Sequence, residues 1–251
     1  LDCSFTSFWF CYFLFIFFIE TFLRILKVEY PIFQKYDKER GFSLLPNSKG
    51  VWRVEGGGKI KINSDGLRDK EHNLKKPENT IRIAILGDSF AEARSVNLKD
   101  TFWFKLKKNL KTCENFHRKK KIEIINFGVS DYGNAQQFIT LKNKVWKYNP
   151  DLVLLAFYSG NDVSDNTKAL SGKKYRPYFV FKNDTLTIDK SYLNSKAYKI
   201  LSSVPGQIFI KLSQYSRSLQ LLREAYVKSY FLEKKNEFQT FKKKEINESN
   251  V

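Results

Sequence analysis

The chain has 251 residues and carries 44 Lys and Arg against 26 Asp and Glu, a formal net charge of +18, with three cysteines and two histidines. This length allows one sizeable domain with a hydrophobic core and some additional segments. So few cysteines and histidines exclude a zinc cluster or a disulfide framework, and we expect chemistry without a cofactor or a metal.

Lysines concentrate in residues 105–121 and 234–244, and this basic charge has two interpretations. It indicates either attraction to anionic lipid headgroups or acidic polysaccharide, or solvated helix faces in a lysine-rich protein. Because no nucleic-acid-binding motif occurs, no nucleic acid partner is expected.

Residues 1–27 are set apart by their apolar composition. No charge occurs from Phe8 to Ile19, and residues 5–26 form the stretch of about 20 mostly apolar residues that a bilayer-spanning helix needs. We predict an uncleaved transmembrane anchor that contacts the lipid bilayer through residues 5–26, with a signal-peptide core or a buried helix as the alternatives. Glu20 and Arg24 lie four residues apart, so they can pair on one face of this helix.

Residues 28–79 carry turn and loop signals rather than a long periodic pattern. Glycines stand at Gly56-Gly57-Gly58, a turn motif at Ser64-Asp65-Gly66, and a short alternating stretch at Lys59 to Ile62. This composition predicts an irregular or two-stranded lead-in that packs on the domain that follows.

Residues 80–170 contain the strands of the predicted core. Apolar runs occur at Ile81 to Leu86, Ile122 to Asn126 and Leu152 to Phe157. Helical patterns separate these runs, and the order β-α-β-α-β predicts an α/β fold with parallel strands and right-handed crossovers.

Two amphipathic helices are predicted between these strands. In the first, Asp100 or Thr101 is the cap, and in the second the cap is Asn134. The apolar positions expected to face the sheet are Phe102, Leu106 and Leu110 in the first helix, and Phe138, Leu141, Val145 and Trp146 in the second.

Each predicted strand ends in a polar loop. The first runs into Gly87-Asp88-Ser89-Phe90, the second into residues 127–133, and the third into Ser159-Gly160-Asn161-Asp162. Gly-Asp-Ser alone is ordinary turn chemistry. Because the carboxyl ends of parallel strands meet at one edge, where open α/β sheets hold ligands, the three loops together favour a binding or catalytic site.

In this order and spacing, the Ser89 loop, the loop with Asn126 and Gly128, and Gly160-Asn161-Asp162 resemble the motif blocks of the SGNH or GDSL-type serine hydrolases. The resemblance extends from about residue 36 to about residue 178 and is closest to membrane-anchored members, in which a segment like 63–69 precedes the first catalytic strand. It implies a three-layer α/β/α fold with a parallel, flavodoxin-like sheet, C-terminally incomplete here and preceded by one transmembrane helix.

The resemblance also implies roles for individual residues. Ser89 is the expected nucleophile, and its own N–H, an N–H of the second loop and the Asn161 side chain are expected to hold the oxyanion. Gly128 and Asp131 are the candidates for the second-loop donor, since Asp131 occupies the position where the family usually has glycine. Asp88 is expected to shape the nucleophile loop, and we place Asp88 and Asp162 beside the substrate.

A general base is missing from this pattern. The family supplies it from an Asp-x-x-His motif near its C-terminus, which does not occur here, and His72 and His117 both lie in polar stretches typical of the surface. Either the sequence is a piece of a longer protein or the protein has lost catalysis. We favour the first explanation.

Residues 171–251 interrupt the α/β alternation. A β-hairpin is predicted from Tyr178 to Ile188 around Asn183-Asp184, followed by helix from about residue 195 to 235. Such an insertion can cover an active site, in which case Tyr175, Tyr178 and Phe179 face an acyl or sugar group; packing is the alternative role of these aromatic side chains.

The sequence therefore predicts a membrane-anchored SGNH-type hydrolase that acts on ester bonds, with an acylated small molecule or the O-acyl groups of cell-envelope glycans as substrate. Arg24 and Lys27 on the domain side of the anchor would favour a cytoplasmic domain, whereas the resemblance suggests an extracytoplasmic one, which we adopt. The alternatives are a noncatalytic membrane-tethered module that binds acylated glycans, and a scaffold that uses its basic surface.

Overall fold

The computed structural model describes residues 3–113 and 121–229. They form two compact units, which we describe separately: residues 31–210, and the described residues up to Tyr30 together with those from Lys211 on. The predictions about His117 and about the lysines at 234–244 lie outside the described residues.

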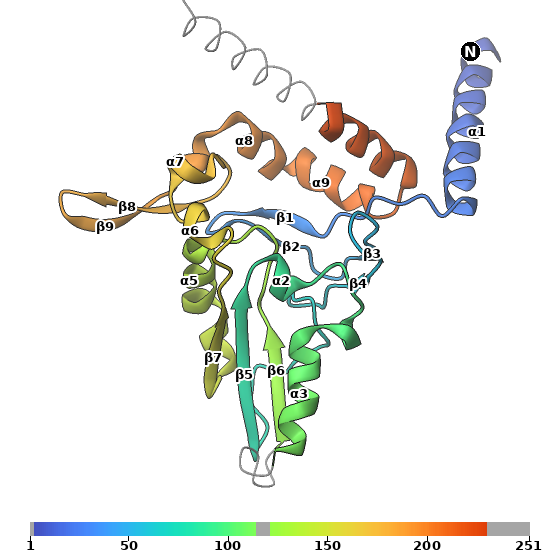
Figure 1. Ribbon diagram of the computed structural model, residues 1–251. Helices are drawn as coiled ribbons and strands as arrows, with labels where there is room; N and C mark the ends of the chain where they lie inside the picture. Colours follow the sequence, from blue (N-terminus) through green and yellow to red (C-terminus); the bar gives the residue numbers. More distant parts are fainter. Residues whose placement is uncertain (1–2, 114–120, 230–251) are drawn as a thin grey trace, which may run out of the picture. The chain divides into compact units, whose positions relative to one another are not determined.

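The core of the larger unit is a parallel sheet of three strands, β5 (Thr80–Gly87), β6 (Lys121–Asn126) and β7 (Leu152–Ala156), in the order β6-β5-β7 (Figure 1). Both pairings of β5 are parallel, with Ile85 opposite Asn126 on one side and Leu154 on the other. The predicted α/β architecture and the three predicted strands are thus confirmed. Because every strand is parallel, the three polar loops begin at the same edge of the sheet.

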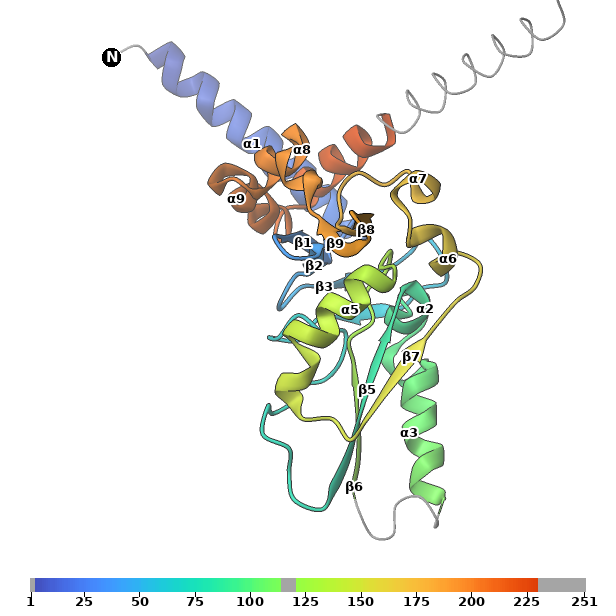
Figure 2. The ribbon, with the colours of Figure 1, turned by 90° about the vertical axis from the view of Figure 1, so that its left-hand side faces the viewer.

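Helices cover both faces of this sheet. Helix α3 (Phe102–Thr112) and helix α5 (Asn134–Asn143), which is followed by the 3₁₀ helix η2 (Val145–Tyr148), lie on opposite sides of it (Figures 1 and 2). Alternate residues of β5 point into different clusters, since Ile83 and Ile85 pack with Trp103, whereas Ala84 and Leu86 pack with Val145 and Tyr148. Each face therefore has its own hydrophobic layer.

The faces of the two helices were predicted only in part. Thr101 caps α3 by accepting a hydrogen bond from the Phe104 N–H, as expected, but Trp103 is the buried residue and Phe102 is exposed. Helix α5 begins one residue earlier than predicted, with Gly133 at the N-cap position in place of Asn134.

The predicted apolar stripe of α5 is also wrong in part. Phe138 and Trp146 are 52% and 55% exposed, and the residues buried under α5 are Ala135, Gln136, Gln137, Ile139 and Thr140. The Phe138 ring instead contacts the ring of Phe179, at 5.7 Å between centroids.

Two short hairpins precede the sheet. Strand β1 (Gln34–Asp37) pairs with β2 (Gly41–Leu44), and β3 (Lys49–Val51) pairs with β4 (Lys59–Lys61), both antiparallel. Their apolar side chains pack on the loop that follows β6, in a cluster formed by Phe33, Phe42, Leu44, Ile60, Ile62, Val129 and Tyr132. The lead-in thus supports one of the three strand-end loops.

Short elements surround and follow the strand ends. Helix α2 (Ser89–Glu92) and the 3₁₀ helix η1 (Leu98–Asp100) follow β5, and α6 (Asp162–Asp165) and α7 (Lys168–Ser171) follow β7. Next comes the predicted hairpin, β8 (Tyr178–Lys182) and β9 (Thr185–Asp189), whose turn residues Asn183 and Asp184 both have positive φ. The elements after the hairpin are η3 (Ser191–Asn194), α8 (Lys196–Ser202) and α9 (Val204–Ser213), so the long predicted helix is broken at Ser203.

The smaller unit contains α1 (Cys3–Ile25) and a helix that includes residues 217–229. The predicted Glu20–Arg24 ion pair is present, at 2.7 Å. The same carboxylate accepts hydrogen bonds from the N–H groups of Arg217 and Ser218, at 2.9 and 3.0 Å, and so satisfies donors at the start of the second helix. By length and hydropathy, no helix among the described residues qualifies as a bilayer span.

Candidate functional site

The structure places Ser89 at the first position of α2, directly after β5. Asp88 is the N-cap, and its Oδ1 accepts a hydrogen bond from the Phe90 N–H at 2.9 Å. This cap turns the chain sharply at the strand end, as expected for a short polar residue before a helix. The Ser89 side chain is exposed, and within the described residues its hydroxyl and its backbone N–H have no hydrogen-bond partner.

Asn161 lies beside this turn. Its Nδ2 donates to Oδ2 of Asp88 at 2.9 Å, while the rings of Phe90 and Tyr158 contact each other at 4.5 Å between centroids. One Nδ2 hydrogen is used by this bond and the other is left to bind a ligand. The ends of β5 and β7 therefore converge as the sequence predicts, with Asp88 joining the turn at Ser89 to Asn161.

The second loop is packed against α2. A Cβ on Gly128 would lie 2.4 Å from the Cβ of Ala91, so only glycine allows this approach. Asn126 is fully buried, donates from Nδ2 to the Ala91 carbonyl at 2.9 Å, and accepts the Gly128 N–H at 3.0 Å. The Gly128 N–H is thus used inside the loop.

Asp131 differs from Gly128 in this respect. Its φ is +72°, in the left-handed region that favours glycine, and within the described residues its N–H has no acceptor. Its carboxylate pairs with the Lys173 ammonium, which balances its charge, and accepts a hydrogen bond from the Tyr175 hydroxyl. Of the two candidates, Asp131 is the one with a free backbone donor.

Glu92 fixes the distance between α2 and the second loop. Its carboxylate is buried and accepts the Ser130 N–H at 2.6 Å and Nε of Arg94 at 2.5 Å. The Arg94 guanidinium in turn lies over the rings of Phe33 and Trp52. Ser130, the residue before Asp131, is therefore tied directly to α2.

Asp162 is buried below Asn161 and accepts the Tyr158 N–H at 2.7 Å. Burial raises its pKa; the Tyr158 hydrogen bond opposes this, and the nearby carboxylates of Asp88 and Asp165 add to it. Both Asp88 and Asp162 thus make hydrogen bonds that shape the loops, and their contact with substrate stays a prediction.

The sequence analysis did not identify Arg68 and Asp69, which support the strand-end loops through hydrogen bonds. The buried Arg68 donates to the carbonyl oxygens of Glu92, Ala93 and Val96, and burial lowers its pKa to about 10. Its neighbour Asp69 accepts the Asn126 N–H at 3.1 Å. The segment 63–69 therefore supports two of the three loops, and nothing in its sequence alone specifies those partners.

The prediction that His72 lies on the surface is wrong. Its ring is buried between Asp69, at 3.1 Å, and Glu123, at 2.7 Å. Burial by itself would lower the pKa of His72, but the hydrogen bonds and charges of the two carboxylates outweigh burial and raise it. His72 is therefore a buried partner of both carboxylates, with Nδ1 hydrogen-bonded to Glu123 and Nε2 within ion-pair distance of Asp69.

We expect His72 to make the protein less stable as pH rises above neutrality. A histidine whose pKa is higher in the folded state binds its proton more tightly there, so its contribution is full below its unfolded pKa, near 6.5, and is lost as pH passes the folded value. Urea unfolding of the wild type at a series of pH values should show this decline as pH rises above about 6.5. His72→Gln should lower stability at pH 6 and flatten the decline; an unchanged slope in the variant would contradict the assignment.

The strand-end loops combine the exposed hydroxyl of Ser89 with N–H donors on Asn161 and Asp131. Acyl transfer by a serine needs these two kinds of group. The described part of the chain places no histidine beside Ser89, and no group of three or more His, Cys, Asp and Glu side chains in that part is arranged to hold a metal ion.

No protein-family model matches the chain, and no curated protein or solved structure is significantly similar to it.

Proposed function

We propose that the full-length protein is a serine esterase of the SGNH type. The observation that carries this proposal is the hydrogen bond between Asn161 Nδ2 and Asp88 Oδ2, at 2.9 Å, which puts the amide next to the turn that exposes Ser89. In the proposed reaction the Ser89 hydroxyl attacks an ester carbonyl, the alcohol leaves, and water releases the acyl group. The strand order β6-β5-β7, with the second strand beside the first, is compatible with the flavodoxin-like sheet of that family.

The developing oxyanion has three candidate donors. They are the Ser89 N–H, the Asp131 N–H and the second Nδ2 hydrogen of Asn161, each without an acceptor among the described residues. Gly128 serves the site by allowing the loop to approach Ala91. A base is still required, because a serine hydroxyl is a weak nucleophile without one, and we place it in a part of the protein beyond the described residues.

We expect ester substrates with an acyl group on a glycan or a small molecule, because Ser89 is exposed and the neighbouring rings of Phe90 and Tyr158, which contact each other, are 57% and 45% exposed. Attachment to a membrane through residues 5–26 belongs to the same proposal. It is supported by the phenylalanines exposed on α1, among them Phe13 at 76% and Phe18 at 65%. A noncatalytic module that binds acylated glycans is the competing function.

Reaction with a fluorophosphonate probe separates the two functions. Such a probe phosphonylates only a serine that a base activates and an oxyanion hole supports, so the full-length protein should be modified at Ser89. Modification should disappear in Ser89→Ala and persist in Ser95→Ala, a control six residues along the same segment. Absence of reaction in a folded full-length protein that binds an acylated glycan would favour the binding module.

A further inference from the structure

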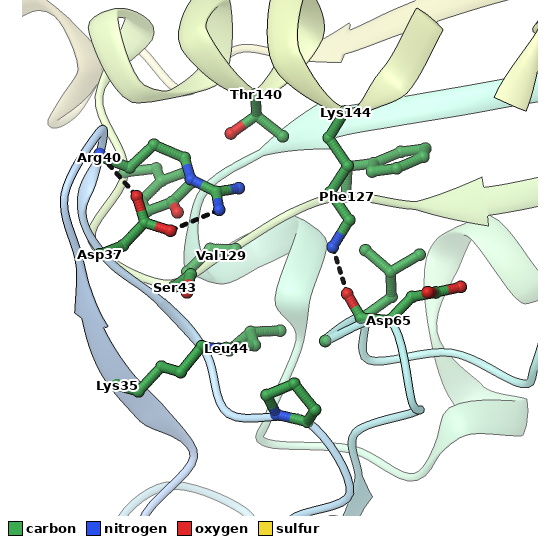
Figure 3. A pocket seen from close by; sticks show the side chains of 14 residues that line it. Lys35, Asp37, Arg40, Ser43, Leu44, Asp65, Phe127, Val129, Thr140 and Lys144 are labelled. Carbon is green, nitrogen blue, oxygen red and sulfur yellow. Dashed lines mark hydrogen bonds and ion pairs between the residues drawn. The ribbon is translucent and has the colours of Figure 1, made fainter. Parts of the chain in front are cut away.

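A cavity of about 100 Å³ lies apart from Ser89, within the larger unit (Figure 3). It is partly open to solvent and is bordered by the β1–β2 hairpin, the turn at Asp65 to Leu67, the loop after β6 and the C-terminal end of α5. Phe127 and Val129 line it, while Gly128 between them packs on Ala91 at the candidate active site. The second loop therefore borders the cavity as well as the candidate active site.

Three cationic side chains line this cavity: Lys35 from β1, Arg40 from the β1–β2 turn, and Lys144 from the end of α5. In Figure 3 the Arg40 guanidinium and the Lys144 ammonium enter the space from different sides. Burial lowers the pKa of Lys144 to about 8, and the charges of Arg40 and Lys35 lower it further while those of Asp65 and Asp37 oppose them. Like charges are thus gathered where solvent screens them poorly.

The two carboxylates of the cavity, Asp37 and Asp65, already have hydrogen-bond donors within the protein. Asp37 pairs with Nη2 of Arg40 at 2.6 Å and accepts the N–H groups of Glu39 and Arg40, both at 2.9 Å. Asp65 Oδ2 accepts the Tyr148 hydroxyl at 2.7 Å, and Lys144 donates to the Asp65 carbonyl. These bonds leave the remaining ammonium hydrogens of Lys144 and Nη1 of Arg40 as free donors.

A further donor comes from the buried Ser43, whose hydroxyl has no partner among the described residues. Thr140 in contrast donates to the Gln136 carbonyl at 2.8 Å and can only accept. The free polar groups of the cavity are therefore hydrogen-bond donors and cations. Its volume is large enough for several water molecules, and so for one small anion.

We propose that this cavity binds a phosphate-type oxyanion, either free or as the phosphate group of a larger molecule. Lys144, Arg40, Lys35 and the Ser43 hydroxyl approach it from separate elements, which suits the several oxygens of a tetrahedral anion, and charge-assisted hydrogen bonds to such oxygens are strong. The site is independent of the proposed esterase activity.

Titration calorimetry of the full chain with inorganic phosphate, at constant ionic strength and pH 7, tests this site. We expect saturable binding with a Kd of about 1 mM or tighter, weakened about tenfold or more in Lys144→Met. Lys142→Met, which changes an exposed lysine two positions away on α5, should bind like the wild type. Ser43→Ala removes a single hydroxyl and should weaken binding about threefold. Circular dichroism should show that each variant is folded.

The source of the phosphate is distinguished with vesicles that contain phosphatidic acid or only phosphatidylcholine. Binding of inorganic phosphate that depends on Lys144 supports a free anion; Lys144-dependent binding of phosphatidic acid vesicles alone supports a lipid headgroup. Equal loss in Lys142→Met and Lys144→Met, or no binding of either probe by the folded wild type, would overturn the proposal.

A pH series with sulfate adds a second readout, because sulfate keeps its charge between pH 6 and pH 9. Sulfate affinity should fall as pH rises through about 8, where Lys144 loses its proton, and the fall should be absent in Lys144→Met. The charged groups that face Lys144 in the cavity are Lys35, Arg40, Asp37 and Asp65. Despite burial, hydrogen bonding and charge within the Asp37–Arg40 pair raise the pKa of Arg40 and lower that of Asp37, away from this range, whereas the pKa of Lys144 lies inside it. An unchanged affinity across the series would contradict the role of Lys144.

Discussion

Replacing Asn161 with alanine should lower kcat/KM of the full-length protein for a small acetate ester by about 10²- to 10³-fold. The reason is that Asn161 Nδ2, held by Asp88 at 2.9 Å, is one of few side-chain donors available to an oxyanion beside Ser89. The negative charge exists only in the transition state and the tetrahedral intermediate. The loss should therefore appear in kcat, with KM changing little.

A matched control is available on the same turn. Val163, two residues from Asn161 and 58% exposed, makes no polar side-chain contact, so Val163→Ala should keep kcat/KM within about threefold of the wild type. Asn161→Asp provides a sharper comparison, since it keeps the shape of the side chain but removes the donor. If Asn161→Asp were as active as the wild type, the amide would have no part in the reaction.

Replacing Arg82 with methionine should lower the free energy of unfolding by about 3–5 kcal/mol, a large share of the stability of such a domain. The guanidinium of Arg82 is fully buried in β5 and bridges elements around the sheet. It contacts Glu123 of β6 at 2.8 Å and donates to the carbonyl oxygens of Leu74, Tyr148 and Asn73, at 2.9, 2.5 and 3.0 Å. Methionine leaves the partly buried Glu123 carboxylate with His72 as its remaining partner, and it leaves these carbonyls without the guanidinium donor.

Urea unfolding at pH 7 measures this loss, and Lys121→Met is its control. Lys121 is an exposed residue at the start of β6, so its replacement should change the free energy of unfolding by no more than about 0.5 kcal/mol. Arg82→Lys should also be costly, because an ammonium cannot reproduce the planar set of donors. A loss below about 1 kcal/mol in Arg82→Met would show that the network adds little stability.

The sheet was predictable because its signals are local. In the run Ile81 to Leu86 every side chain after the partly buried Ile81 is buried, and a mostly apolar run followed by a polar turn is typical of a parallel strand. The same holds for the hairpin turn at Asn183-Asp184, where both residues adopt positive φ. Local patterns therefore located Ser89 and Asn161 at the correct strand ends.

The predictions that were wrong concern side chains whose partners lie far away in the sequence. His72 is surrounded by polar residues in sequence, yet it is buried because Glu123 of β6 lies against it. Phe138 was expected to face the sheet, but it contacts Phe179 of the hairpin. The carboxylate of Asp131 pairs with the Lys173 ammonium and accepts a hydrogen bond from the Tyr175 hydroxyl, more than 40 residues later in the chain. No short-range pattern carries this information.

The central claim is that Ser89 and Asn161 act on the same acyl group. A crystal structure of the full-length protein after phosphonylation tests it directly, because the phosphonyl oxygen marks the position of the oxyanion. We expect the phosphorus bonded to Ser89 Oγ and that oxygen within about 3 Å of Asn161 Nδ2, with a backbone N–H of the second loop as a further donor. A phosphonyl oxygen that points away from Asn161, or an adduct on another serine, would contradict the claim.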